Sequence, residues 1–137
     1  MTPQALIEQA KEAMLHAYVP YSGYKVGAAL LCTDGTVYGG CNIENASYSP
    51  TNCAERTAFF KAVYDGHRDF VAIAVVGGKD GVITGAFPPC GVCRQVMREF
   101  CNDDFLIHIG GADGSFQTLT LAQLLPYSFS AAEHMQG

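Results

Sequence analysis

Three cysteines and one glutamate stand at spacings that suit metal chemistry. Cys53 and Glu55 are one residue apart, 36 residues separate Cys53 from Cys90, and Cys90 and Cys93 form a Cys-x-x-Cys pair. If Cys90 begins a helix, Cys93 lies one turn on and on the same side, so both sulfurs can face one ion. Zinc takes tetrahedral nitrogen and sulfur ligands, and a catalytic site leaves the fourth position to water. The pattern therefore predicts a three-cysteine zinc site with an open position.

Each half of this pattern also has a structural alternative. A Cys-x-x-Cys pair occurs in redox sites and structural zinc sites. A non-enzymatic zinc-binding module, in which a fourth ligand such as Cys41 completes the coordination of zinc, is therefore an alternative interpretation. Asn52 and Glu55 match a capping box at the start of a helix. Beside a zinc ligand, however, Glu55 reaches metal-bound water without ligating the metal, which suits a general acid and base.

The charge of such a site needs compensation. Three thiolates and Zn²⁺ sum to −1, which disfavours ionisation of a bound water. A helix N-terminus carries roughly +0.5 charge and lowers the pKa of a thiol placed there. Arg56 and Arg94 each follow a cysteine motif directly. We favour Arg56 over Arg94 as the donor of hydrogen bonds to thiolate sulfur.

The pattern of apolar and turn residues predicts the elements that position these residues. Helices are expected over 2–17, ended by Pro20, over 53–64, from Cys90 to Phe100 and over 121–125. Strands are expected over 25–32, 36–41, 70–77, 105–110 and 116–119, with turns at Asp34-Gly35 and Asp113-Gly114 and a loop over 42–52. The 53–64 helix is apolar nearly all round, which indicates burial on most faces.

The order of these elements predicts an α/β fold. A hairpin followed by strands that alternate with helices suggests a mixed sheet of about five strands with helices on both faces, a three-layer α/β/α arrangement. The 137 residues contain no repeat and no linker, so a single domain over 1–137 is expected.

Composition excludes several classes of protein. Eight Lys and Arg against 13 Asp and Glu give a net charge of −5, which argues against a nucleic-acid polymer as partner. No stretch approaches the roughly 20 apolar residues that cross a bilayer, so no membrane contact is expected. Six cysteines without a secretory signal indicate the cytoplasm. A chain that is 49% hydrophobic favours an oligomer.

Four blocks of sequence resemble, in order, the small homotetrameric zinc-dependent cytidine deaminases. They are YSGYKVGAAL at 21–30, GCNIENAS at 40–47, CAERTA at 53–58 and PCGVCRQ at 89–95, within a match from about Tyr18 to Phe129. A ligand-x-Glu element followed by Pro-Cys-x-x-Cys is typical of zinc nucleobase deaminases. The resemblance implies hydrolytic deamination of cytidine and 2′-deoxycytidine to uridine and 2′-deoxyuridine, with release of ammonia, in pyrimidine salvage.

The resemblance also implies residue roles. One Zn²⁺ per subunit is held by Cys53, Cys90 and Cys93, and Glu55 shuttles protons while zinc-activated hydroxide attacks C4 of the base. The resemblance further implies that Asn42 and Glu44 bind the ribose and that the Ala54 backbone contacts the base. Tyr24, where the family often has Phe, is expected to pack against the ligand. Tyr48 and Phe129 are expected to contribute to a neighbouring subunit's pocket.

The same motifs leave one alternative substrate open. Another cytosine-bearing small molecule, such as blasticidin S, is the alternative substrate, although Asn42 and Glu44 favour a ribose. A nucleoside monophosphate is disfavoured because no basic cluster lies near the motifs. The remaining cysteines, Cys32, Cys41 and Cys101, are expected to be buried apolar residues. The histidines, His16, His67, His108 and His134, have no ligand-spaced partner in the sequence.

Overall fold

The computed structural model describes residues 1–135, without the side chains of Glu133 and His134. Its elements are α1 (Pro3–Met14), β1 (Tyr24–Cys32), β2 (Val37–Cys41), α2 (Ala54–Tyr64), β3 (Phe70–Lys79), α3 (Gly91–Phe100), β4 (Leu106–Gly110), β5 (Phe116–Thr120), α4 (Leu121–Leu124) and α5 (Ala131–His134). The described part does not include the side chain of His134 or the last two residues of the predicted 1–137 domain. Among the described residues, no helix has both the length and the apolar character that a membrane crossing requires.

One mixed sheet organises the chain. The strand order is β2-β1-β3-β4-β5. β3 and β4 run parallel, whereas the other neighbouring pairs are antiparallel. This topology confirms the predicted α/β fold with a mixed five-stranded sheet.

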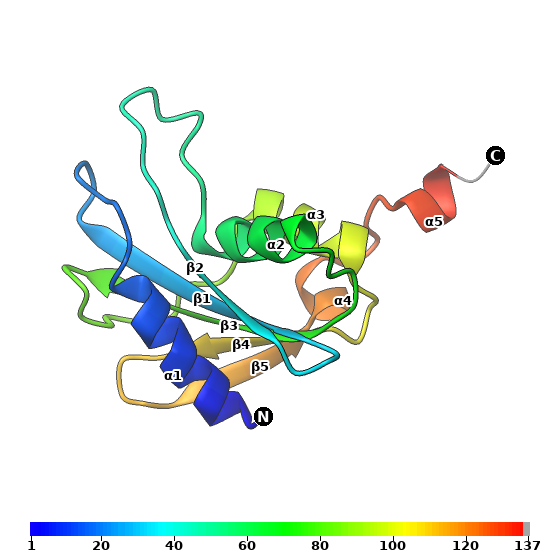
Figure 1. Cartoon of the computed structure of the whole chain (residues 1–137), viewed down its shortest axis with the longest axis horizontal. Coiled ribbons are helices and arrows are strands. Elements are labelled where there is room, and N and C mark those ends of the chain that lie inside the picture. The colour runs from blue at the N-terminus through cyan, green and yellow to red at the C-terminus, as the bar shows by residue number, and fades with distance from the viewer. Residues whose placement is uncertain (136–137) are drawn as a thin grey trace.

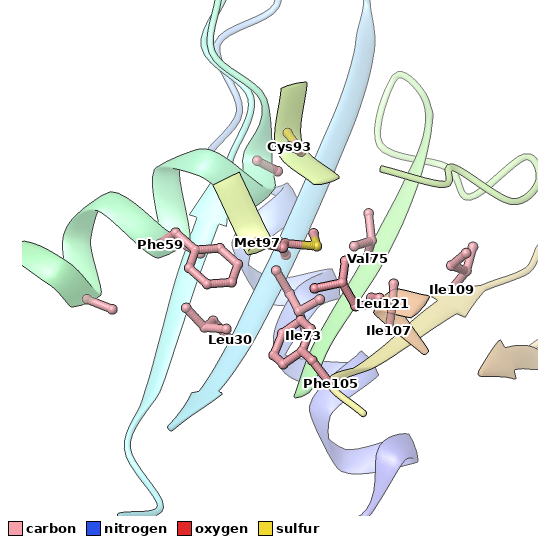
Figure 2. Close-up of a cluster of buried hydrophobic side chains, with 14 residues drawn as sticks. Leu30, Phe59, Ile73, Val75, Cys93, Met97, Phe105, Ile107, Ile109 and Leu121 are labelled. Atoms are coloured by element: carbon pink, nitrogen blue, oxygen red, sulfur yellow. The ribbon is translucent and has the colours of Figure 1, made fainter. Parts of the chain in front are cut away.

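Helices cover both faces of the sheet and enclose two apolar clusters. On one face, α1 buries Leu6, Ile7 and Met14 against the sheet. On the other face, α2, α3 and α4 lie over a larger cluster, whose members include Phe59 and Met97 (Figure 2). Figure 1 shows α1 on one side of the sheet and α2 with α3 on the other. The three-layer arrangement is therefore confirmed.

The first helix ends earlier than its apolar pattern suggests. α1 stops at Met14, although the spacing continues to Ala17. Tyr18 instead pairs with the segment after β2, since its N–H donates to the Asn42 carbonyl at 3.0 Å and its carbonyl accepts from the Glu44 N–H at 2.9 Å. The chain therefore leaves the helix to form tertiary hydrogen bonds that a helix pattern does not reveal.

The helix after the long loop is buried on most of its surface, as predicted. One stripe is exposed, with Phe60 at 49% and Tyr64 at 90%, and apart from Lys61 the other positions of α2 are buried or half-buried. The expectation of burial on most faces is therefore confirmed, because α3 and the sheet cover the rest of α2. One element was missed, the short α5, which follows the last predicted helix.

Candidate active site

The starts of α2 and α3 bring three sulfur atoms together. Cys53 is the N-cap residue of α2 and Cys90 is the N-cap residue of α3. Neither side chain makes a capping hydrogen bond. Cys93 lies in the first turn of α3 and is buried. Figure 2 shows its side chain above that of Met97. The two N-cap sulfurs are therefore available for another partner.

The spacing of these sulfurs fits zinc. The Sγ atoms of Cys53 and Cys90 are 3.7 Å apart, and all three sulfurs lie within 4.8 Å of one another. A tetrahedral ion with Zn–S bonds of about 2.3 Å holds its sulfurs about 3.8 Å apart. Among the side chains that the structure describes, which exclude Glu133 and His134, the group contains no fourth Cys, His, Asp or Glu. Cys41, the proposed fourth ligand of a closed site, is outside it, and so the three donors could hold zinc with one position open.

Arg56 supplies positive charge to the sulfur cluster. Its Nη2 donates to Cys53 Sγ at 3.2 Å. Hydrogen bonds from Cys93 and then Arg56 lower the pKa of the Cys53 thiol to about 5, against the opposing effect of burial. Arg94 instead donates to the backbone carbonyls of Pro89 and Leu124, both at 2.7 Å. Of the two arginines considered from the sequence, Arg56 is therefore the one that contacts sulfur.

Glu55 is a buried carboxyl beside the cluster. It is 4% exposed, and burial raises its pKa to about 7. The capping-box alternative is wrong, because the helix begins at Ala54 and the Asn52 side chain donates to Thr57 Oγ1 at 3.1 Å. A carboxyl that is buried, next to a metal-ligand candidate and close to neutral in pKa has the properties of a proton carrier.

Close contact with β2 sets the position of the first turn of α2. A Cβ on Gly40 would lie 2.2 Å from the Ala54 carbonyl oxygen and 2.6 Å from the Ala58 nitrogen. Only glycine permits this approach, since real Cβ atoms do not come within 3.0 Å of backbone. The start of α2, with Cys53 and Glu55, is therefore fixed against the strand that leads to Asn42.

The loop over 42–52 closes back on itself beside the cysteines. Ile43 and Asn52 exchange two backbone hydrogen bonds of 2.9 Å, so Asn42 and Cys53 flank the same pair (Figure 1). Asn42 accepts from the Val26 N–H and donates to the Tyr24 carbonyl, each at 2.9 Å. Asn42 therefore lies at the base of the loop, beside the start of α2.

Glu44 joins the same loop to the residues before β1. Its Oε1 accepts from the N–H groups of Tyr21 and Ser22 at 3.0 and 3.1 Å, and its Oε2 accepts from Ser22 Oγ at 2.5 Å. The hydrogen bond from the Ser22 hydroxyl is the main reason that the pKa of Glu44 lies below its usual range. The side chains of Asn42 and Glu44 thus contact one segment, residues 21–26, and a carboxylate is held there.

The predicted aromatic contributors are exposed in the single chain. Tyr24 is 44%, Tyr48 is 73% and Phe129 is 58% exposed. Tyr48 also has a positive φ of 60° and meets the Tyr21 ring at 6.3 Å between centroids. It lines a hollow of about 360 Å³ together with Tyr21 and Glu44. Phe129 lies elsewhere, where its carbonyl accepts from Gln95 Nε2 at 3.0 Å. Tyr48 and Phe129 are therefore not brought together within one chain.

Two residues beside Tyr24 were missed from the sequence. The Phe87 ring lies 6.2 Å from the Tyr24 ring, and Lys79 Nζ lies 5.0 Å from the Tyr24 centroid. Lys79 also donates to the Ser22 carbonyl at 2.9 Å. Phe87 is in a loop without periodicity and Lys79 ends a strand, so no local signal linked either to Tyr24.

A family model and two similar known proteins indicate the same family. Residues 1–109 match the family model described as the cytidine and deoxycytidylate deaminase zinc-binding region. The cytidine deaminase of Sporosarcina psychrophila is 54% identical over 130 residues, which are 95% of this chain and 93% of that protein. The cytidine deaminase of Halalkalibacterium halodurans is 53% identical over 97% of this chain and 98% of that protein.

Solved structures agree with the sequence relatives. The crystal structure of cytidine deaminase from Burkholderia pseudomallei superposes with a TM-score of 0.87 at 49% identity, covering 94% of this chain and all of the other. Cytidine deaminase from Mycobacterium tuberculosis gives a TM-score of 0.80 at 38% identity, over 94% of this chain and 98% of that one.

Proposed function

The chain belongs to the cytidine and deoxycytidylate deaminase family, whose members are zinc-dependent hydrolases, and on that premise we propose the reaction and the role of each site residue. The protein adds water to C4 of cytidine or 2′-deoxycytidine and releases ammonia, so the products are uridine and 2′-deoxyuridine. The observation that carries this proposal is the convergence of the Cys53, Cys90 and Cys93 sulfurs beside buried Glu55.

The three cysteines hold one Zn²⁺ per subunit in this proposal. Their sulfurs are spaced as a tetrahedral zinc requires, and two helix N-termini and Arg56 offset the negative charge of three thiolates. When bound, zinc supplies Lewis acidity that makes water a nucleophile near neutral pH.

Glu55 carries the protons of the reaction. Its carboxylate accepts a proton from the attacking water and delivers it to N3 of the base as the oxygen–C4 bond forms. Glu55 then takes the proton of the new C4 hydroxyl and transfers it to the 4-amino nitrogen, so that the bond from C4 to this nitrogen breaks, a carbonyl forms at C4 and ammonia leaves. Burial of Glu55 supports this role, because a carboxyl whose pKa is about 7 exchanges protons readily in both directions.

Residues of β1, of the 42–52 loop after β2 and of the start of α2 orient the nucleoside. Asn42 and Glu44 bind the sugar hydroxyls, the Ala54 backbone contacts the base, and the Tyr24 ring packs against it. A neutral planar base needs aromatic walls and a few directed hydrogen bonds, which this group of residues provides. Orientation by the sugar contributes to rate as well as to binding.

The active form is a homotetramer in which neighbouring chains complete each site. Tyr48 and Phe129 are exposed and lie apart within one chain, which supports a role in a neighbouring subunit's pocket. The exposed rings of Phe60 and Tyr64 on α2 supply further apolar surface. The domain over 1–137 acts on free nucleosides in the cytoplasm, in pyrimidine salvage.

The loss of ultraviolet absorbance when cytidine becomes uridine tests the reaction directly. Purified protein is expected to deaminate cytidine, to lose activity with a chelator and to regain it with added zinc. Activity that survives complete removal of metal from folded protein contradicts the proposal. A competition between cytidine and blasticidin S tests the substrate class, and turnover of blasticidin S alone overturns the assignment of a nucleoside.

A further inference from the structure

A second group of metal-ligand side chains lies at the other end of α2 from Glu55. Cys32 ends β1, Asp34 lies in the β1–β2 turn and His67 follows the C-terminus of α2. One ligand atom from each lies within 4.8 Å of the others, and we name these three residues the hairpin cluster. Figure 1 shows the β1–β2 turn at the end of the sheet opposite the 42–52 loop.

A hydrogen-bonded relay orients the His67 ring. The Tyr38 hydroxyl donates to Asp65 Oδ2 at 2.8 Å. The single hydroxyl proton is then committed to Asp65. The contact of 3.2 Å between Tyr38 Oη and His67 Nδ1 is therefore made by an N–H on Nδ1, with the Tyr38 oxygen as acceptor.

This tautomer leaves the other ring nitrogen facing a carboxylate. His67 Nε2 lies 3.1 Å from Asp34 Oδ2, while Asp34 Oδ1 is held by the Thr36 N–H at 3.0 Å. In the neutral ring with its proton on Nδ1, Nε2 presents a lone pair to an oxygen that also presents lone pairs. A cation between the two atoms is needed, and it is either a proton on Nε2 or a metal ion.

The sulfur of Cys32 distinguishes these two cations. A proton between Nε2 and Asp34 needs no third partner, whereas a soft transition metal gains from a thiolate beside an imidazole and a carboxylate. The Tyr38 relay is also the arrangement that orients metal-bound histidines, in which the second ring nitrogen donates to a neighbouring acceptor. The Cys32 sulfur and the Tyr38 contact therefore favour a metal over a proton.

We propose that the hairpin cluster is a second divalent transition-metal site, of the zinc class, with Cys32 Sγ, His67 Nε2 and Asp34 Oδ2 as ligands. Tetrahedral zinc with these donors needs ligand atoms about 3.3 to 3.6 Å apart, so atoms that lie within 4.8 Å of one another must close by about 1.5 Å at most. The Asp34 and His67 side chains are 59% and 24% exposed, so an ion enters from solvent and water takes the fourth position.

The role of this site is to join three elements that are distant in sequence. A metal bound there ties the β1–β2 turn to the C-terminal end of α2, whose other end carries Cys53 and Glu55. Because binding occurs in the folded chain alone, the ion stabilises the fold by an amount that rises with the logarithm of its concentration above the Kd. With one thiolate in place of three, the hairpin cluster holds zinc less tightly than the active-site cysteines.

Zinc content tests the proposal in protein whose active site is already loaded. After dialysis against buffered micromolar zinc, we expect two zinc ions per wild-type chain by atomic emission. We expect one in His67→Gln and in Asp34→Asn, and two in the matched control His16→Gln, which changes an exposed histidine outside the cluster. Zinc added to loaded wild type raises its thermal midpoint, and the two cluster variants do not respond.

Two further variants separate metal binding from a fold defect. Tyr38→Phe keeps all three ligands and removes the acceptor of His67 Nδ1, so the affinity of the second zinc falls about 10- to 100-fold. Co²⁺ added to wild type that holds zinc in the active site alone gives a thiolate-to-cobalt absorption band that is absent in Cys32→Ser. A wild-type content of one zinc overturns the proposal, as does a content of two that persists in His67→Gln and Asp34→Asn.

Discussion

The Arg56 guanidinium donates from Nη2 to the sulfur of Cys53 over 3.2 Å, three residues along the same helix. The Arg56 Nε is buried and has no hydrogen-bond partner within the described residues. A buried guanidinium is costly unless it is paired with negative charge. This pairing explains how three thiolates can share one small volume, because the arginine and two helix N-termini oppose their charge.

Replacement of Arg56 by Gln is expected to weaken zinc binding. Loss of a group that orients and neutralises a metal ligand costs about 10- to 100-fold in metal affinity or activity. Zinc competition with a chromophoric chelator measures the affinity, and cytidine turnover measures the activity. Arg68→Gln is the matched control, since Arg68 donates only to the carbonyls of Val63 and His67. Equal losses in both variants contradict the role of Arg56.

Glu55→Gln is expected to retain zinc and lose turnover. The amide keeps the shape of the buried side chain but cannot carry a proton, and loss of a general acid and base costs about 100- to 10,000-fold. Metal analysis and cytidine turnover of the same preparation provide the measurement. Glu12→Gln, which changes an exposed glutamate on α1, serves as the control. Turnover within a few-fold of wild type in Glu55→Gln excludes the proton-carrier role.

Cys41 and Cys90 distinguish an open zinc site from a closed one. Cys90→Ser removes a sulfur that lies 3.7 Å from Cys53, so the active-site zinc and the activity are expected to be lost. Cys41→Ser changes a sulfur outside the three-cysteine group and is expected to leave both unchanged. The comparison is made by zinc content and turnover, and loss of zinc from Cys41→Ser supports a four-ligand structural site.

Local sequence patterns were sufficient to predict most elements and the three-cysteine group. Cys90 and Cys93 sit one turn apart on a helix, and helix geometry alone places both sulfurs on one side. The alternation of strands and helices likewise predicted a mixed sheet. These features depend on short-range geometry, which the spacing of residues in the sequence indicates directly.

Contacts between distant segments could not be predicted in this way. The helix at the N-terminus ends at Met14 because Tyr18 pairs with the backbone around Ile43, which no pattern near residue 18 indicates. The hairpin cluster joins Cys32 to His67 across 35 positions, and neither residue has a ligand at a motif spacing. Both features depend on the register of the finished sheet.

Burial of His108 predicts a loss of stability in mild acid. His108 is 4% exposed, its Nδ1 lies 2.8 Å from Thr118 Oγ1, and burial lowers its pKa below 6.5. Between the folded and unfolded pKa values the unfolded chain binds more protons, so the free energy of unfolding falls as pH drops below about 6.5. Below the folded pKa the contribution of His108 no longer changes.

Urea unfolding of wild type and His108→Gln from pH 5 to pH 7.5 isolates this effect. Both proteins share the zinc site and the His67–Asp34 pair, so the difference between their stability curves reports His108 alone. We expect the wild type to lose more stability than the variant as the pH falls through this range. Parallel curves contradict the buried neutral state of His108.

Gly40→Ala tests whether contact between β2 and α2 positions the catalytic groups. The added methyl group meets the Ala54 carbonyl oxygen at 2.2 Å, so α2 must move away from β2 and take Cys53 and Glu55 with it. Gly39→Ala is a matched control in the same strand, because its methyl group meets only the Ala13 side chain at 3.4 Å.

Overpacking costs about 1 to 3 kcal/mol, and displacement of about 1 Å at a catalytic group costs about 100-fold in rate. We therefore expect Gly40→Ala to lose stability, zinc affinity and turnover together while Gly39→Ala keeps all three, as measured by urea unfolding, chelator competition and cytidine deamination. Equal behaviour of the two variants means that the position of α2 is set elsewhere.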